Sequence, residues 1–473
     1  TTGTDNVAVG KDALKATGAG TDGSYNVAVG VGSLEANTEG QFNVAIGRRS
    51  LYANTTADEN TAVGYLTLYS NTTGGGNTAL GVSALQANTT ASNNTAVGNR
   101  ALTANTTGDE NVAVGRNALT ANTTGIRNTA VGHGVLNTCT TGTYNTGVGR
   151  AVMDDLTTGT ENTAMGNFAM GETTTGSYNV AIGGSALADN LVGESNTALG
   201  HLSLRSNTAS NNTAVGRLSL RYNTTGSLNT AVGSSALTTN TTGGNNVAIG
   251  FAALQLSTTA SNNTAVGYAA MNANTTGYDN VAVGRNSLDA NTTGYANVSV
   301  GESSLTSNTT GYRNTAVGKS SLEVCSTGVE NTAVGQNAAA DVTTGGSNTA
   351  IGQNALGACT TSSSNTAVGV NALLGNTASQ NTAVGGNALR SNTSGIYNTA
   401  VGYNALRDVT SGNYNTALGY QAGYECTGSG NVFVGLNAGR DATSADYNTY
   451  IGWDAGLLTT SGDSNTALGN LAL

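Results

Sequence analysis

Four cysteines are the most reactive side chains of this chain, and their spacing limits the chemistry they could perform. They are Cys139, Cys325, Cys359 and Cys426. No two of them form the CxxC pair that is typical of a zinc site. All four stand at the same point of a repeated phrase, where asparagine is usual and where valine and leucine also occur. We therefore interpret them as small apolar filler side chains, with bonding between chains as the alternative.

Histidines and carboxylates give little support for acid–base catalysis. His133 and His201 are the only histidines, and no set of nucleophile, histidine and acid recurs. Asp154 and Asp155 are adjacent, which is more typical of a solvated corner than of a site. The repeated glycines form neither a phosphate loop followed by a helix nor a calcium-binding β-roll motif. The sequence predicts no enzyme activity, no metal site and no cofactor.

The elements that carry these residues are copies of one short phrase. The stretch "NTAVGNRALTANTTGDENVAVG", from Asn94 to Gly115, begins and ends on nearly the same five residues. Anchored on the Asn that opens each phrase, the chain holds 28 units; 23 of the 27 intervals are seventeen residues, three are sixteen and one is twenty. We predict one repeat array over residues 1–473. Its first unit, 6–25, is irregular, and its last units, 415–473, are altered as if they approach a junction.

Fixed positions within the unit predict short strands joined by corners. Counted from the Asn, position 5 is Gly in all 28 units, position 4 is always Val, Ile, Leu or Met, and position 3 is Ala in 24. Positions 2 and 4 alternate with position 3 as strand residues do, and Asn and Gly suit the corners. We expect positions 2 and 4 to point into the core with the Leu of position 9, and two or three strands in each coil.

Stacked coils of this kind make an all-β fold. Successive coils of a parallel stack lie about 4.8 Å apart, so 28 coils would extend over roughly 130 Å. The sequence predicts a parallel β-solenoid or β-roll of about 28 coils with a repeat of seventeen residues.

The Asn-Thr-Thr run at position 12 has two interpretations. Eleven units match the glycosylation acceptor pattern there, including Asn54, Asn105 and Asn291. Alternatively, inward Asn side chains form a hydrogen-bonded ladder along the stack. We favour the ladder, because Val and Leu replace this Asn in other units.

Composition excludes several kinds of partner. Only 9% of the residues are charged, and the net charge of −10 is spread thinly. Nucleic acid and anionic membranes are not expected, because both require clustered Lys and Arg. The sequence contains no run of about 18 apolar residues, so we expect no membrane-spanning segment. The chain starts at Thr1 without a Met or a signal peptide, so we expect a processed or partial chain.

An outward alanine stripe would suit a partner chain. If position 3 points away from the core, then Ala96, Ala113 and Ala130 lie on the outer surface and would allow close packing against another copy. We therefore expect a homo-oligomer, with a homotrimer as the leading expectation. Neither end of the sequence carries a capping element, which predicts a segment of a longer fibre or end-to-end assembly.

The repeats resemble those of known fibrous proteins. The run "NTAVGYNALRDVTSGNYNTALGYQAG", from Asn398 to Gly423, resembles repeats in the head and stalk regions of trimeric autotransporter adhesins and in phage tail fibres. The resemblance covers essentially the whole chain and implies a trimeric parallel β-roll. The unit here is longer than that of the adhesin heads.

These observations lead to two functional expectations. The first is an extracellular structural fibre, on a bacterial surface or a virion, whose variable corners could contact a receptor or a cell-surface glycan. The second is a binding module with a patterned Thr and Asn face for glycans or ice.

Overall fold

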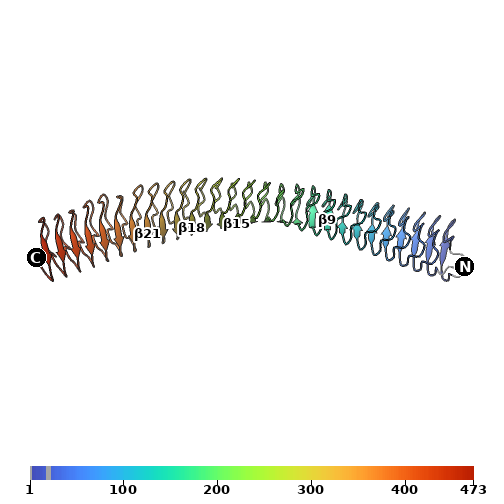
Figure 1. Cartoon of the computed structure of the whole chain (residues 1–473), viewed down its shortest axis with the longest axis horizontal. Helices are drawn as coiled ribbons and strands as arrows, with labels where there is room; N and C mark the ends of the chain where they lie inside the picture. Colours follow the sequence, from blue (N-terminus) through green and yellow to red (C-terminus); the bar gives the residue numbers. More distant parts are fainter. Residues whose placement is uncertain (1–2, 17–22) are drawn as a thin grey trace. The chain divides into compact units, whose positions relative to one another are not determined.

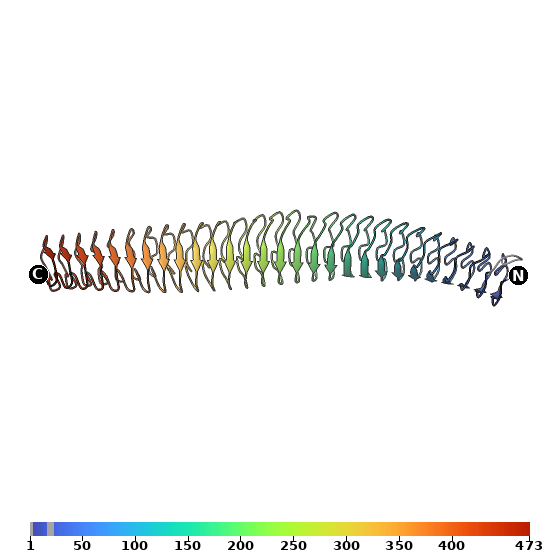
Figure 2. The ribbon, with the colours of Figure 1, turned by 60° about the horizontal axis from the view of Figure 1, so that its bottom comes forward.

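The repeats fold into an all-β parallel solenoid. The computed structural model describes residues 3–16 and 23–473, and no helix occurs among them. The chain divides into two compact units, Thr1–Ser234 and Ser235–Leu473. Within each unit every coil contributes one short strand, and successive strands lie side by side (Figures 1 and 2). The predicted fold class and the seventeen-residue spacing are confirmed.

Among the residues that the structure describes, each unit has fourteen strands. The strands of the first unit are β1 (Val7–Val9), β2 (Val27–Val29), β3 (Val44–Ile46), β4 (Thr61–Val63), β5 (Thr78–Leu80), β6 (Thr95–Val97), β7 (Val112–Val114), β8 (Thr129–Val131), β9 (Thr146–Arg150), β10 (Thr163–Asn167), β11 (Val180–Ile182), β12 (Thr197–Leu199), β13 (Thr213–Val215) and β14 (Thr230–Val232). The strands of the second unit are β15 (Val247–Ile249), β16 (Thr264–Val266), β17 (Val281–Val283), β18 (Val298–Val300), β19 (Thr315–Val317), β20 (Thr332–Val334), β21 (Thr349–Ile351), β22 (Thr366–Val368), β23 (Thr382–Val384), β24 (Thr399–Val401), β25 (Thr416–Leu418), β26 (Val432–Val434), β27 (Thr449–Ile451) and β28 (Thr466–Leu468).

Successive strands within each unit pair in parallel and in register. In the pair β6 and β7, Ala96 lies beside Ala113, and Val97 lies beside Val114. The same positions of the repeat pair in the second unit, as in β20 and β21. Equal positions therefore form straight columns along each unit. The sequence repeat thus becomes a spatial repeat.

Each coil contains one strand rather than the two or three that we expected. The rest of the coil consists of turns and bends. These turns still hydrogen-bond to the next coil, since Leu85 N donates to Ala101 O at 3.1 Å and Thr89 N donates to Thr106 O at 3.1 Å. The expectation was wrong because inter-coil hydrogen bonds do not require extended backbone at every position.

Left-handed backbone conformations bend the turns. Positions 7, 9 and 17 have positive φ in most coils, as at Arg49 (57°), Leu51 (48°) and Glu59 (61°). A left-handed conformation costs about 1–2 kcal/mol for a residue with a side chain. Leu51 adopts it with its side chain fully buried and its N–H donated to Thr67 O at 3.0 Å. Burial and hydrogen bonding thus hold a conformation that leucine rarely adopts.

Glycine at position 5 is required by both backbone angle and space. Gly98 has a φ of 140°, which side chains with a Cβ rarely adopt. A Cβ there would lie 2.4 Å from the carbonyl oxygen of Gly115 in the next coil. The invariance of this glycine over all 28 units follows from the close approach of stacked backbones.

The core lies on the opposite side of the strand from the one we expected. Positions 3, 8 and 9, such as Ala96, Ala101 and Leu102, are fully buried. Positions 2 and 4 are half-buried or exposed, as at Thr95 and Val97. The alternation was correctly predicted, but its direction was wrong. A leucine reaching across a narrow coil leaves room only for a methyl group at position 3, so the larger Val is placed outside.

Core volume is compensated wherever position 3 changes size. Gly147 replaces the usual Ala where Val135 and Val152 occupy position 8, and a Cβ on Gly147 would lie 2.5 Å from Val135 Cγ1. Phe433 at position 3 is fully buried, and position 9 of the same coil is Gly439 instead of Leu. A Cβ on Gly439 would lie 2.3 Å from Phe433 Cδ1.

This compensation explains much of the altered C-terminal sequence. Tyr450 is paired with Gly456 in the same way, where an added Cβ would lie 2.4 Å from Tyr450 Cδ2. The change from Ala and Leu to an aromatic ring and Gly therefore keeps the core filled within the same coil. A junction after these coils stays a prediction.

Candidate functional site

The three alanines predicted for a chain–chain interface lie inside their own coils. Ala96, Ala113 and Ala130 have no exposed surface. They cannot contact a partner chain, and the prediction of their outward orientation is wrong. The physical reason is the narrow interior, which accepts only a small side chain opposite leucine.

The outward surface of each strand consists instead of positions 2 and 4, which we call the strand face. Position 2 is Thr or Val and position 4 is aliphatic in all 28 strands, so the face carries no charge. Several position 4 side chains are well exposed, including Ile46 (40%), Leu80 (47%) and Ile351 (40%). Register pairing aligns them into a continuous apolar column within each unit.

Charged corners flank the strand face of the first unit. Positions 6 and 7 follow the strand, and their Lys and Arg, which we call the basic rim, are Lys11, Arg48, Arg49, Arg100, Arg116, Arg150 and Arg217. Positions 16 and 17 precede the strand, and their Asp and Glu, which we call the acidic rim, are Asp5, Asp58, Glu59, Asp109, Glu110, Glu161 and Glu194. The exceptions in this unit are Asp12 on the basic side and Arg127 on the acidic side. The two signs are thus separated across the face.

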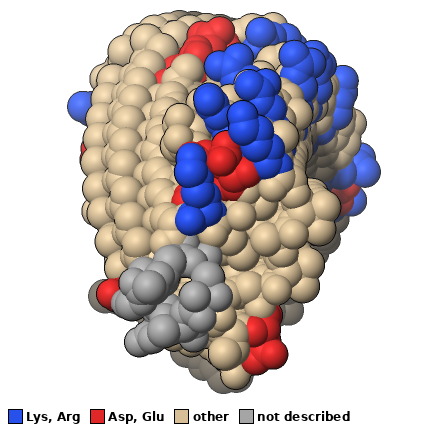
Figure 3. Space-filling view, turned by 90° about the vertical axis from the view of Figure 1, so that its right-hand side faces the viewer, with Lys and Arg blue, Asp and Glu red and all other residues tan. Residues whose placement is uncertain are grey.

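The basic rim has free charge. All seven of its side chains are exposed. Among the described residues, none of the seven lies within ion-pair distance of a carboxylate; Arg48 lies over the ring of Tyr65, with Cζ 5.9 Å from the ring centroid. In the end-on view of Figure 3, most of the visible Lys and Arg side chains gather along one flank.

The acidic rim contains one ion pair along the stack. Arg127 Nε lies 2.7 Å from Glu110 Oε2 of the preceding coil. Hydrogen bonding and charge attraction from Arg127 lower the pKa of Glu110 below its usual value. Both side chains are exposed, so solvent screening keeps this pair weak.

The corners of the second unit are built differently. Positions 6 and 7 hold two basic residues, Arg285 and Lys319, and two acidic ones, Glu302 and Asp454. Neutral Asn side chains instead follow one another at position 7. Asn337 Nδ2 donates to Asn354 Oδ1 at 3.3 Å. The corner after the strand therefore carries little net charge in this unit.

Aromatic side chains stack along the surface. Tyr278, Tyr295 and Tyr312 form a row with ring centroids 5.1 and 4.8 Å apart. Tyr25 and Phe42 stack in the same way in the first unit. Rings stacked on one another cover most of their faces, so they offer edges and hydroxyl groups rather than open platforms for a sugar.

The predicted Asn ladder at position 12 is confirmed. Asn105 is fully buried, and its Nδ2 donates to Asn88 Oδ1 at 2.9 Å and to Gly108 O at 3.0 Å. Asn54 and Asn291 make the same contacts with their preceding coils. The alternative of glycosylation at Asn54, Asn105 and Asn291 is contradicted in the folded chain, because these amide nitrogens are enclosed and already hydrogen-bonded.

A second ladder at position 1 was missed in the sequence. Asn111 N donates to Asn94 Oδ1 at 2.9 Å, and Asn111 Nδ2 donates to Gly125 O at 2.9 Å. The signal was present, since position 1 is Asn in all 28 units. A corner residue that needs only a turn conformation would vary among Asn, Asp and Gly.

The cysteines occupy ladder positions as buried fillers, as predicted. All four are free and have no exposed surface. Burial raises the pKa of the Cys139 and Cys325 thiols to about 11 and that of Cys426 to about 12. The Oδ1 atom of Asn122, in the coil before Cys139, has no partner, because the thiol cannot replace the amide donor of the ladder.

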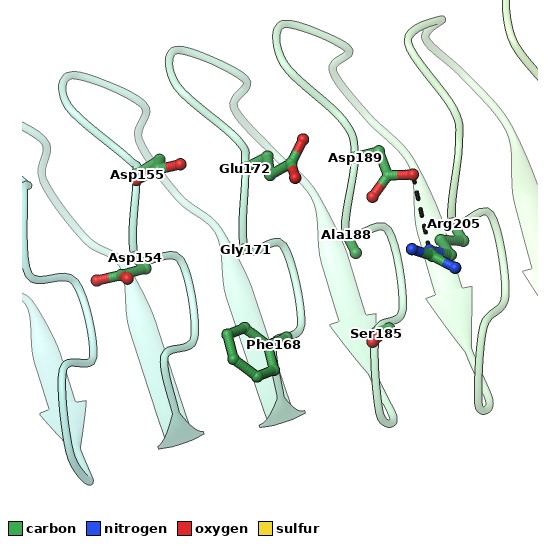
Figure 4. A pocket seen from close by; sticks show the side chains of 9 residues that line it. All are labelled: Asp154, Asp155, Phe168, Gly171, Glu172, Ser185, Ala188, Asp189 and Arg205. Atoms are coloured by element: carbon green, nitrogen blue, oxygen red, sulfur yellow. Dashed lines mark ion pairs between the residues drawn. The ribbon is translucent and has the colours of Figure 1, made fainter.

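Asp154 and Asp155 line a shallow hollow in the first unit. It measures about 400 Å³ and includes Glu172, Asp189 and Arg205 from the following coils (Figure 4). Arg205 Nε lies 3.7 Å from Asp189 Oδ2. Burial, and then the charge of Asp155, raise the pKa of Asp154. His133 and His201 are exposed and do not line this hollow.

No family model matches the chain, and no curated protein matches it. Among the described residues, no group of three or more His, Cys, Asp or Glu side chains is placed to hold a metal ion. The same residues contain no helix long and apolar enough to cross a membrane.

Proposed function

We propose that this chain is a structural module, the stiff shaft of an extracellular fibre, with a mechanical rather than a catalytic role. One observation carries the proposal: backbone hydrogen bonds and the buried Asn ladder of position 1 connect each coil to the next, and the ladder of position 12 adds a further link wherever successive coils both carry Asn there. Bending a coil away from its neighbour would break several of these bonds together. Such a cross-linked stack resists bending and local unfolding.

The setting we propose is a bacterial surface filament or a phage tail fibre, with more than one copy of the chain side by side. The resemblance of the repeats to adhesin and tail-fibre repeats supports this setting. Varied residues at the exposed corners, such as Tyr268 and Trp453, would contact a receptor or a cell-surface glycan.

Electron microscopy of the purified chain tests the proposal. We expect straight filaments with a contour length of roughly 130 Å, from 28 coils about 4.8 Å apart. The variant Asn105→Ala/Asn111→Ala interrupts both ladders at one level, and it should produce filaments with a bend at a constant distance from one end. Flexible, irregular particles from the unaltered chain would contradict a shaft.

A second candidate function is binding through the strand face. Outward Thr at position 2 supports it, since 19 of the 28 units place a Thr hydroxyl there in a column beside the aliphatic column. The Asn side chains of both ladders point inward, so the Thr hydroxyl groups would be the only regularly spaced polar groups on the strand face. Thermal hysteresis would test ice binding, and a glycan array would test sugars; activity that is lost in Thr95→Lys would favour this function over the shaft.

A further inference from the structure

We infer that the strand face of the first unit is the packing surface for a second copy of this chain, aligned parallel to the first. The inference rests on the proposed function and makes it specific, because it names the face and the relative direction of the copies. It is carried by the uncharged face, by the opposite charges on its two rims and by the unpaired state of the basic rim.

The face is large enough to be an interaction surface. Each coil adds two side chains about 7 Å apart and a rise of about 4.8 Å, so the 14 coils of the first unit present roughly 450 Å² in flat projection. The position 4 half of this area is apolar, and the position 2 half is Thr in nine coils and Val in five. Exposed apolar patches of a few hundred Å² on soluble proteins are often interaction sites. Burying Ile46, Leu80 and their column neighbours would remove them from water.

The rims select a parallel arrangement. Two copies with parallel axes, packed face to face, are related by a rotation about the direction of the stack. This rotation places the basic rim of one copy opposite the acidic rim of the other, and each basic residue then faces an acidic residue of the same coil level or of an adjacent one. The same relation holds around a threefold axis, where the basic rim of each copy lies beside the acidic rim of the next.

An antiparallel arrangement is disfavoured by the same charges. Two copies related by a rotation about the strand direction place each rim opposite its own kind. Like charges that face each other across an interface oppose association. This repulsion disfavours the antiparallel arrangement, and it contributes more to the choice of direction than the attraction between opposite charges in the parallel one.

The unpaired basic rim supports this arrangement. Arg100 and Arg116 are exposed, and among the described residues neither lies within ion-pair distance of a carboxylate. Asp109 and Glu110 stand at the other side of the face, in neighbouring coils. A second copy would therefore bring each Arg to a carboxylate that its own chain does not supply.

Cross-linking between copies tests the face and the direction together. Ser92 and Asn99 are neutral residues that flank β6 on its acidic and basic sides. A mixture of the Ser92→Cys and Asn99→Cys variants, treated with a short bismaleimide, should yield a cross-linked dimer. The four native thiols are fully buried and should not react. As a matched control, Asn167→Cys with Ser92→Cys should cross-link poorly, because exposed Asn167 lies four coils away.

Charge reversal gives a second measurement. Arg48→Glu/Arg49→Glu/Arg100→Glu/Arg116→Glu reverses four of the seven charges of the basic rim and makes both rims acidic between β3 and β7. Asp58→Lys/Glu59→Lys/Asp109→Lys/Glu110→Lys reverses four of the seven charges of the acidic rim and makes both rims basic over the same stretch. Each variant alone should associate about tenfold more weakly or worse at low salt. Mixing the two variants should restore association, which a folding defect would not allow. Circular dichroism of each variant checks the fold.

Different failures have different meanings. Cross-linking that is equal for the matched and control pairs, or association that ignores charge reversal, would overturn the inference while an oligomeric shaft remains. A chain that stays monomeric at every concentration, measured by sedimentation velocity, would also overturn it. Flexible particles in micrographs would overturn the shaft itself.

Discussion

The two units of the molecule use the same coil for different surfaces and different interiors. The first unit carries an unbroken run of six ladder Asn residues from Asn37 to Asn122 and separates positive from negative charge across its strand face. Cys139, Leu156 and Thr173 end this run in the first unit, and in the second unit Cys, Val and Ala interrupt the ladder so often that its longest run is three Asn residues, Asn274 to Asn308. In the second unit Asn residues and rings also occupy the corners, and Phe433 and Tyr450 replace core alanines. Both keep the same register and the same glycine at position 5.

The comparison shows which constraints belong to the coil. Backbone approach between coils fixes Gly at position 5, and inward Asn at position 1 recurs in both units. The core can exchange Ala and Leu for a ring and Gly, provided that the volume is conserved. The fold does not require charge at the corners, since both units build the same coil with different charges there.

The largest effect is expected in the aromatic coils of the second unit. Phe433→Ala should lower the free energy of unfolding by about 3–5 kcal/mol, because Gly423 and Gly439 supply no side chain to fill the cavity. Urea denaturation followed by circular dichroism measures the loss.

A double variant separates volume from other effects of that change. Phe433→Ala/Gly439→Leu restores the usual pair of the first unit, and Gly439 has a φ of 59°, close to the 55° of Leu288. We expect at least half of the lost stability to return. A double variant no more stable than Phe433→Ala would contradict volume compensation.

The ladder run of the first unit should be the next most sensitive feature. Asn105→Ala leaves the buried Oδ1 of Asn88 without its donor and removes the acceptor of Asn122, so we expect a loss of about 2–4 kcal/mol. At the equivalent position of the second unit, Cys325→Ala removes a small apolar group with a weak donor and should cost about 1 kcal/mol. Equal losses in the two variants, measured by urea denaturation, would show that the ladder does not stabilise the first unit.

Alkaline conditions should weaken the second unit more than the first. Burial raises the pKa of Cys325 to about 11 and that of Cys426 to about 12, against an ordinary value of 9.0. Between the unfolded and the folded pKa the native state binds more protons than the unfolded state, so stability is complete below about pH 9 and falls as pH rises. Each of these thiols contributes a loss of about 1 kcal/mol per pH unit in this window.

Alanine variants identify the source of this pH dependence. Replacing Cys325, Cys359 and Cys426 by Ala should flatten the decline of stability between pH 9 and pH 11, whereas Cys139→Ala should change it much less. The measurement is urea denaturation across that range under reducing conditions. A slope that does not change in the triple variant would assign the decline to other groups.

The smallest effect is expected for the stacked surface rings. Tyr295→Ala removes the middle ring of the row Tyr278, Tyr295 and Tyr312 and should cost about 0.5–1.5 kcal/mol beyond the area it exposes. Tyr178→Ala in the first unit is the control, since Tyr178 is exposed and stacks on no ring among the described residues. Thermal unfolding should shift less for the control.

Much of the fold could be predicted from the repeat. The period, the strand at positions 2 to 4, the glycine corner, the buried Leu of position 9 and the Asn ladder of position 12 all follow from recurrence inside one chain. The candidate interface could not be predicted, because it depended on which side of the strand is inside. Paired changes did carry that information: Gly147 occurs with Val135 and Val152, and Phe433 occurs with Gly439.

The sequence by itself determined the architecture: a short phrase repeated 28 times, with Asn and Gly at fixed corners, specifies stacked coils. Only the tertiary structure decided the direction of each side chain. Alternation along a strand distinguishes two faces but gives no reason to choose between them. The choice depends on the volume left when Leu102 reaches across the coil, and that volume accepts the methyl group of Ala96 but not the larger side chain of Val97. Valine therefore faces outward, where the charged rims of the first unit flank it.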